Sequence, residues 1–145
     1  MGNSSSRDLI QQKLDTATKT GILNLEKQEV KSNSPVWGSL RAPELAEKIT
    51  LLDLTCNPLK SLPAHILLLE RLKTLKIKRC NLQRLPNLST LNEMTTIELD
   101  NNDLEETTIG PLPVSMTKLI LSFNHIKKFP DILNVLVNLQ HLDVR

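Results

Sequence analysis

The start of the chain carries the residue best placed for covalent modification. Met1 is followed by Gly2, and Ser6 supplies the hydroxyl of the pattern Met-Gly-x-x-x-Ser/Thr. Removal of the methionine exposes the amine of Gly2, which is the acceptor for N-myristoylation in sequences of this pattern. The sequence therefore predicts a lipidation site at Gly2, with an unmodified N-terminus as the alternative.

Histidine side chains and phosphate-binding loops are the other candidates for chemistry. The spacing of His65, His125 and His141 would not bring two of them together on a metal ion. A glycine-rich phosphate loop is absent from this sequence, which has only 4 glycines. We therefore expect no catalytic residues, no metal and no cofactor, and we expect that the protein is not an enzyme.

Length, charge and cysteine content exclude further classes of protein. The 145 residues suffice for one domain, and a formal net charge of +2 gives no strong attraction to nucleic acid. No apolar run approaches the roughly 20 residues of a membrane-spanning helix, and no secretory signal opens the chain. The 2 cysteines, Cys56 and Cys80, are too few for a disulfide framework. We expect free thiols in a reducing, cytoplasmic compartment.

An internal repeat in the sequence predicts the structural elements that position the candidate residues. Four segments align on apolar residues that precede an asparagine or a cysteine: ITLLDLTCNPL (49–59), LKTLKIKRCNL (72–82), MTTIELDNNDL (94–104) and MTKLILSFNHI (116–126). A fifth copy starts at residue 139, and successive copies begin 23, 22, 22 and 23 residues apart. The alternating apolar residues within each copy predict a short strand with one face turned inward.

This pattern resembles the L-x-x-L-x-L-x-x-N/C-x-L motif of the leucine-rich-repeat family, whose period is about 20–29 residues. The endings at 62–63 and 85–86 (Leu-Pro) and at 129–130 (Phe-Pro) resemble the short intracellular class; 107–108 (Thr-Thr) departs from it. The resemblance implies an α/β solenoid with a short parallel sheet on the concave face of an arc. It also implies that one inward side chain in each turn bonds the buried backbone. We call these residues the asparagine ladder: Asn57, Cys80, Asn102 and Asn124.

The chain divides into three expected segments. Residues 1–20 hold the acylation site and a capping helix, which the apolar spacing of Leu9, Ile10, Leu14 and Ala17 predicts.

Residues 21–48 hold a degenerate first repeat, with Gln28 at the asparagine position, and an irregular segment in which Pro43 starts a helical turn. Residues 49–145 hold the repeats. The fifth is cut off at 144–145, and we expect a truncated chain or a short isoform whose open edge promotes self-association.

Binding is expected on the concave side, where strand residues point away from the core; we call this surface the outer sheet face. The expected partner-binding residues are Lys73, Lys76, Lys78, Arg79, Glu98, Asp100 and Ile120. One interpretation is a basic docking patch for an acidic peptide or a lipid headgroup.

The other interpretation pairs opposite charges across adjacent strands. In this interpretation Lys76 lies between Asp53 and Glu98, and Lys78 pairs with Asp100. Lys73 and Arg79 are left without an obvious partner, so they are favoured for binding. Phe123 adds an apolar group beside Ile120, although the resemblance implies that Phe123 packs partly under its turn.

These features favour a non-enzymatic protein–protein interaction module that a myristoyl group tethers to a membrane surface. The residues MGNS and Lys19–Gly21 also resemble a membrane-associated, intracellular member of the family. We therefore expect a cytoplasmic protein with peripheral membrane association and an unidentified protein ligand. The alternatives are a regulatory or targeting subunit of a phosphatase or ubiquitin ligase, and a nonfunctional fragment.

Overall fold

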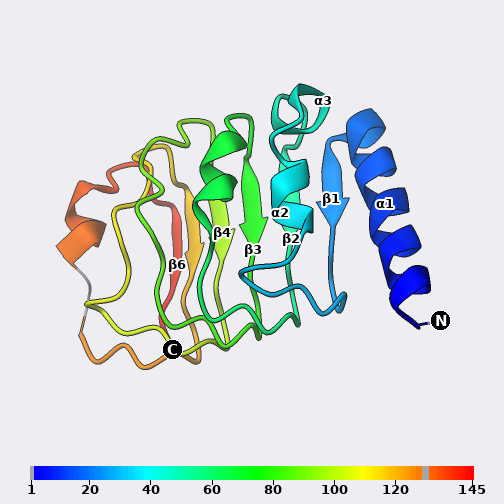
Figure 1. Ribbon diagram of the computed structural model, residues 1–145. Coiled ribbons are helices and arrows are strands. Elements are labelled where there is room, and N and C mark those ends of the chain that lie inside the picture. Colours follow the sequence, from blue (N-terminus) through cyan, green and yellow to red (C-terminus); the bar gives the residue numbers. More distant parts are fainter. Residues whose placement is uncertain (1, 129–130) are drawn as a thin grey trace.

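The protein is a solenoid of six parallel strands that stack in chain order next to an N-terminal helix (Figure 1). The computed structural model describes residues 2–128 and 131–145, with backbone only at residues 2–6 and 132; the Phe129-Pro130 ending lies outside these ranges. The strands are β1 (Ile22–Asn24), β2 (Leu51–Asp53), β3 (Thr74–Lys76), β4 (Thr96–Glu98), β5 (Lys118–Ile120) and β6 (His141–Asp143).

The middle residue of each strand fixes the register of the sheet. Leu52 pairs with Leu75, Leu75 with Ile97, and Ile97 with Leu119, and all four side chains are fully buried. Burial of such a side chain contributes about 1.5–3 kcal/mol, so a slip of one residue would expose a whole row of the core. The leucine periodicity therefore sets both the stacking and the direction in which the outer residues point.

Helix α1 (Gly2–Thr20) covers the free edge of β1 and closes this end of the core (Figure 1). Leu14 and Ala17 are buried, and Ile10 packs against the core. The sequence-based expectation was wrong for Leu9, which is 43% exposed. Leu9 lies instead on the side of α1 that lines a surface groove together with Ile22 of β1.

The long first unit is explained by two short helices in the irregular segment, α2 (Val36–Ser39) and α3 (Pro43–Ala46). Trp37 is buried, and its indole Nε1–H donates to the Lys31 carbonyl at 2.7 Å. Helix α3 begins at the expected proline and packs against α1. The segment thus adds apolar residues to the first end of the solenoid, although it does not fit the repeat.

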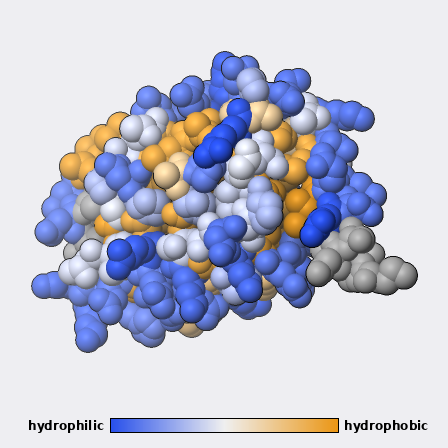
Figure 2. All heavy atoms as spheres, viewed as in Figure 1, coloured by the Kyte–Doolittle hydropathy of each residue, from blue (hydrophilic) through white to orange (hydrophobic). Residues whose placement is uncertain are grey.

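The returning segments opposite the sheet are mostly irregular, with 3₁₀ turns at η1 (Ala64–Leu68) and η2 (Asp131–Val135). On the face that carries α2, apolar side chains gather in patches between hydrophilic ones (Figure 2). None of the helices in residues 2–128 and 131–145 has the length and apolar composition needed to cross a bilayer.

Gly21 ends α1 and provides the first prediction. Its φ is +76°, and a Cβ there would lie 2.7 Å from the Lys48 carbonyl oxygen. We expect Gly21→Ala to lower the free energy of unfolding by roughly 2 kcal/mol, because it adds both backbone strain and a backbone clash. Urea denaturation measures the effect.

Gly38 is the matched control, because a Cβ there would meet nothing within 4 Å and the residue lies in α2. Gly38→Ala should stabilise the protein by roughly 0.5–1 kcal/mol through helix propensity. Equal effects of the two substitutions would contradict the close approach at Gly21.

Candidate functional site

The outer sheet face is a regular array of polar side chains on adjacent strands. The sheet register places Asp53 beside Lys76, Lys76 beside Glu98, and Glu98 beside Ile120. All four side chains are half-buried, because each is flanked by its neighbours about 4.8 Å away along the sheet. The face therefore presents a fixed sequence of charges to any molecule that lies across it.

Only one ion pair on this face joins adjacent strands among the described residues, and its geometry corrects the expected pairing. Lys78 Nζ lies 3.2 Å from Glu98 Oε1, whereas the sequence had placed Lys78 against Asp100. The long lysine side chain reaches diagonally, so equivalence in the register does not decide the partner. The hydrogen bond with Glu98 raises the pKa of Lys78, with smaller contributions from the Asp100 and Asp53 carboxylates.

Three further cations of the second repeat on this face make no ion pair within the described part of the chain: Lys73, Lys76 and Arg79. For Lys76 this result differs from the expected pairing with Asp53 or Glu98, since Glu98 is held by Lys78. Lys73 and Arg79 are exposed, and Lys76 is half-buried. The face thus keeps positive charge that no carboxylate of the chain neutralises directly.

The residue before each position of the asparagine ladder has a left-handed backbone. Cys56, Arg79, Asn101 and Phe123 have φ between +55° and +62°. This conformation costs roughly 1–2 kcal/mol for a residue with a Cβ, and Asn tolerates it best. The turn needs it so that the next side chain can point inward.

Phe123 differs from the expectation that it packs under its turn, because it is 65% exposed. Its left-handed backbone directs the ring away from the core, while Ile120 on the same repeat is half-buried. An exposed aromatic ring beside an apolar residue is the kind of group that anchors protein interfaces. The sequence pattern could not reveal it, since exposure depends on the turn geometry.

Asp100 adds an unsatisfied acceptor to the same face. Its Oδ2 accepts from Asn101 Nδ2 at 3.1 Å, but its buried Oδ1 has no hydrogen-bond partner. The nearest expected donor, Lys78, is bonded to Glu98. On the outer sheet face, the third repeat therefore has a carboxylate oxygen without a donor. The second repeat has cations without a carboxylate partner.

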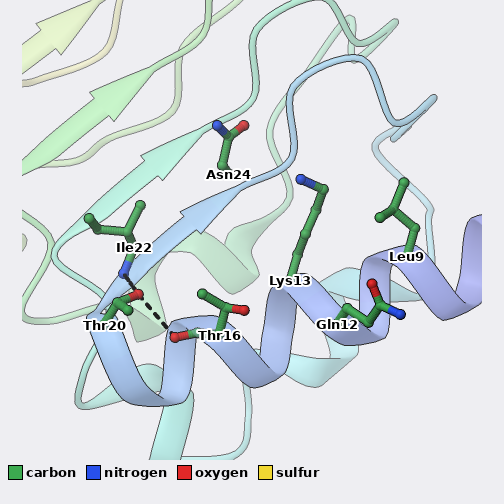
Figure 3. Close-up of a pocket in the computed structure, with 7 residues that line it drawn as sticks. All are labelled: Leu9, Gln12, Lys13, Thr16, Thr20, Ile22 and Asn24. Atoms are coloured by element: carbon green, nitrogen blue, oxygen red, sulfur yellow. Dashed lines mark hydrogen bonds between the residues drawn. The ribbon is translucent and has the colours of Figure 1, made fainter.

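A groove of about 420 Å³ lies between α1 and β1, where the outer sheet face meets the helix (Figure 3). Leu9 and Ile22 form its apolar walls, and Lys13, Thr16 and Asn24 also line it. Ile22 and Asn24 are the outward residues of β1, so the groove is continuous with the outer sheet face. No pattern in the sequence indicates this groove, because it forms between two separate elements.

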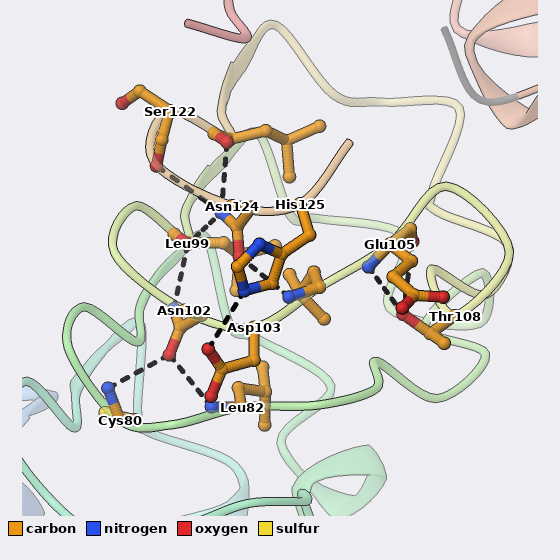
Figure 4. Close-up of polar contacts among 12 residues, drawn as sticks. Cys80, Leu82, Leu99, Asn102, Asp103, Glu105, Thr108, Ser122, Asn124 and His125 are labelled. Atoms are coloured by element: carbon orange, nitrogen blue, oxygen red, sulfur yellow. Dashed lines mark hydrogen bonds and ion pairs between the residues drawn. The ribbon is translucent and has the colours of Figure 1, made fainter. Parts of the chain in front are cut away.

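The asparagine ladder ties successive turns together inside the solenoid (Figure 4). Asn102 Oδ1 accepts from the backbone N–H groups of Cys80 at 2.9 Å and Leu82 at 3.0 Å. Its Nδ2 donates to the carbonyls of Ile77 at 2.6 Å and Leu99 at 2.8 Å. An amide side chain is needed here, because it provides donors and an acceptor together.

Neighbouring ladder residues share the same carbonyls. Asn124 Nδ2 also donates to Leu99 at 3.0 Å, which joins the third turn to the fourth. Asn57 bonds the degenerate first repeat in the same way, through the Val30 N–H and the Leu25 carbonyl, both at 2.9 Å. The side chain of Gln28, at the corresponding position of that repeat, bonds only the nearby Glu26 carbonyl among the residues that the structure describes.

Cys80 fills the ladder position of the second repeat with a weaker set of bonds. Its thiol is fully buried and donates to the Leu54 carbonyl at 3.0 Å or the Lys78 carbonyl at 3.2 Å. Burial raises the pKa of the thiol to about 11, although the backbone N–H groups of Asn57 and Cys56 oppose the shift. Both cysteines are free, and Cys56 is only half-buried.

The raised pKa of Cys80 predicts a loss of stability in alkali. The neutral thiol is favoured in the fold, so its contribution is complete below the unfolded pKa of 9.0 and is lost as the pH rises toward 11. We expect the free energy of unfolding to fall by roughly 2–3 kcal/mol over this pH range, as measured by urea denaturation.

Cys80→Asn is the matched variant. An amide does not titrate and adds hydrogen bonds, so this variant should be as stable as the wild type or more stable at pH 7, and it should lose less stability above pH 9. A large loss of stability at pH 7 would contradict the inward placement of Cys80.

The remaining candidates lie apart from one another. Gly2 is the first residue of α1, His65 lies in η1, and His141 begins β6. His125 Nε2 lies 3.3 Å from Asp103 Oδ1 on the surface (Figure 4). Across the described ranges, no three His, Cys, Asp or Glu side chains are grouped in a way that could hold a metal ion. The site with the most developed geometry is therefore the outer sheet face.

A search of the sequence against models of known protein families finds no match.

Proposed function

We propose that this chain is a leucine-rich-repeat protein of the short intracellular class. The 22- or 23-residue period, the stacked parallel strands and the inward amides of the asparagine ladder support this assignment. Each of these features follows from the same motif, because the leucines fill the core and the asparagine satisfies the turn.

Within this family we propose a non-enzymatic module that binds a protein partner through the outer sheet face. The observation that carries the proposal is the set of unpaired cations, Lys73, Lys76 and Arg79, on a scaffold whose backbone is fixed by the sheet and the ladder. Because the backbone is already ordered, binding costs mainly the rotamer freedom of these side chains, about 0.5–1.5 kcal/mol each. A net charge of +2 favours a protein ligand over nucleic acid.

We further propose that myristoylation of Gly2 gives the protein a weak attachment to the cytoplasmic side of a membrane. Gly2 begins α1, at the end of the solenoid next to β1, so an acyl chain there would leave most of the outer sheet face open. Membrane attachment and partner binding can then occur together and reinforce each other.

Site-specific photo-crosslinking in cells tests the proposed binding face. A photoreactive amino acid at Thr96, on β4 of the outer sheet face, should crosslink to a discrete protein. The same group at Asn87, which is exposed in the connection between β3 and β4, is the control and should not. Equal crosslinking at the two positions, or none at Thr96, would contradict the proposal.

A further inference from the structure

Two exposed side chains on the outer sheet face belong to residues with the same left-handed backbone. Arg79 and Phe123 have φ of +55° and +59°, and both side chains are exposed. Asn101 occupies the equivalent position on the repeat between them, with φ of +62°. We call the three residues the turn ridge.

The backbone keeps the turn ridge straight and evenly spaced. The N–H of Arg79 donates to the Asp100 carbonyl at 3.2 Å, and the N–H of Asn101 donates to the Ser122 carbonyl at 3.0 Å. Each residue of the ridge is therefore one strand spacing from the next along the backbone. This spacing puts the Cα atoms of Arg79 and Phe123 about 10 Å apart. Asn101 is held between them by its hydrogen bond to Asp100.

Arg and Phe are unfavourable residue types for the left-handed backbone of the turn ridge. Left-handed positions favour Asn or Gly, and a bulky residue there is an outlier. Phe123 also leaves 65% of its surface in water, and Arg79 makes no ion pair in the described part of the chain. Exposed Arg and Phe side chains of this kind are typical of a binding surface.

We propose that the turn ridge binds one α-helix of a partner protein, with a carboxylate against Arg79 and an apolar side chain against Phe123. This inference rests on the proposed function, in which the outer sheet face binds a protein. Two turns of an α-helix advance about 10.8 Å, close to the separation of the two anchors. On an extended strand, residues that face the same way are about 6.8 Å or 13.6 Å apart, which fits less well.

The charges of the neighbouring side chains also favour this occupant. Lys76 and Lys78 lie on the same repeat as Arg79, and Lys76 makes no ion pair within the described residues. A carboxylate on the partner would therefore approach a positive region, with Arg79 free to form a bidentate pair. Ile120, half-buried on the repeat of Phe123, extends the apolar end.

Synthetic helical peptides test the spacing. The probe carries Glu at position i and Leu at i+7 on an otherwise Ala/Gln helix, and a control carries the same residues at i and i+4. Fluorescence anisotropy should give affinity for the i,i+7 peptide about tenfold higher than for the control. Equal affinity, or no binding of either peptide, overturns the proposal.

Variants of the protein test the anchors. Arg79→Glu should weaken binding of the Glu peptide about tenfold and favour a peptide with Lys in place of Glu. Phe123→Asn should also weaken binding while raising the urea midpoint, because Asn suits the left-handed backbone. A residue with only a structural role would lose stability instead. Arg84→Glu, at an exposed position outside the turn ridge, should change neither property.

The photo-crosslinking at Thr96 separates this inference from the proposed function. Crosslinking in cells without binding of the i,i+7 peptide would overturn the helix on the turn ridge and leave a protein-binding face. Absence of both would overturn the two proposals together.

Discussion

Asn102→Ala should lower the free energy of unfolding by roughly 3 kcal/mol or more. The substitution leaves the buried N–H groups of Cys80 and Leu82 and the carbonyl of Ile77 without the side chain that bonds them. Each unsatisfied buried group costs about 1–3 kcal/mol. Because a solenoid is stabilised mainly between neighbours, a defect at a central repeat weakens both sides.

Urea denaturation followed by circular dichroism measures this loss. Asn92→Ala is the matched control, since Asn92 is exposed and its side chain makes no hydrogen bond among the described residues; its effect should stay within about 0.5 kcal/mol. If Asn102→Ala unfolds at the wild-type midpoint, then the ladder is not what holds the buried turns.

Gly2→Ala should abolish acylation and move the protein entirely into the soluble fraction. Only an N-terminal glycine presents the amine that myristoyltransferase uses. Metabolic labelling with an alkyne analogue of myristate should mark the wild type and the control Ser4→Ala, which changes a variable position of the pattern. A wild type that stays unlabelled in cells with active transferase would remove the membrane part of the proposed function.

The labelled wild type should itself divide between cytosol and membrane. One myristoyl chain gives an association constant of only about 10⁴ M⁻¹. In residues 1–20 the cations Arg7, Lys13 and Lys19 against the carboxylates Asp8 and Asp15 leave a charge of +1. A basic helper segment would have roughly 4–8 clustered positive charges. Fractionation should therefore show partial membrane association that a bound partner strengthens.

The positions of the strands could be predicted from the sequence because they depend on a local pattern. A period of 22 or 23 residues puts Leu75 and Ile97 in equivalent places, and alternation within each strand turns them inward. The same counting placed Asn102 at a turn, where its amide meets the buried backbone groups of two repeats. The helix that covers the first strand was also predicted, from the spacing of Leu9, Ile10, Leu14 and Ala17, although Leu9 is exposed.

Properties that depend on contacts between distant residues could not be predicted in this way. Trp37 and α2 complete the first end of the core, but their segment has no repeat to align. The groove between Leu9 and Ile22 depends on how α1 packs beside β1, which no local pattern in the sequence specifies.

The outer sheet face shows most clearly where sequence pattern and tertiary structure divide. The repeat alone determined that Lys76, Lys78 and Glu98 would point outward, because strand alternation and register are local rules. Only the folded chain decided that Lys78 reaches Glu98 at 3.2 Å instead of Asp100 and that Phe123 is exposed. Long side chains have several rotamers within reach of several partners, and the three-dimensional arrangement of charges and turns selects among them.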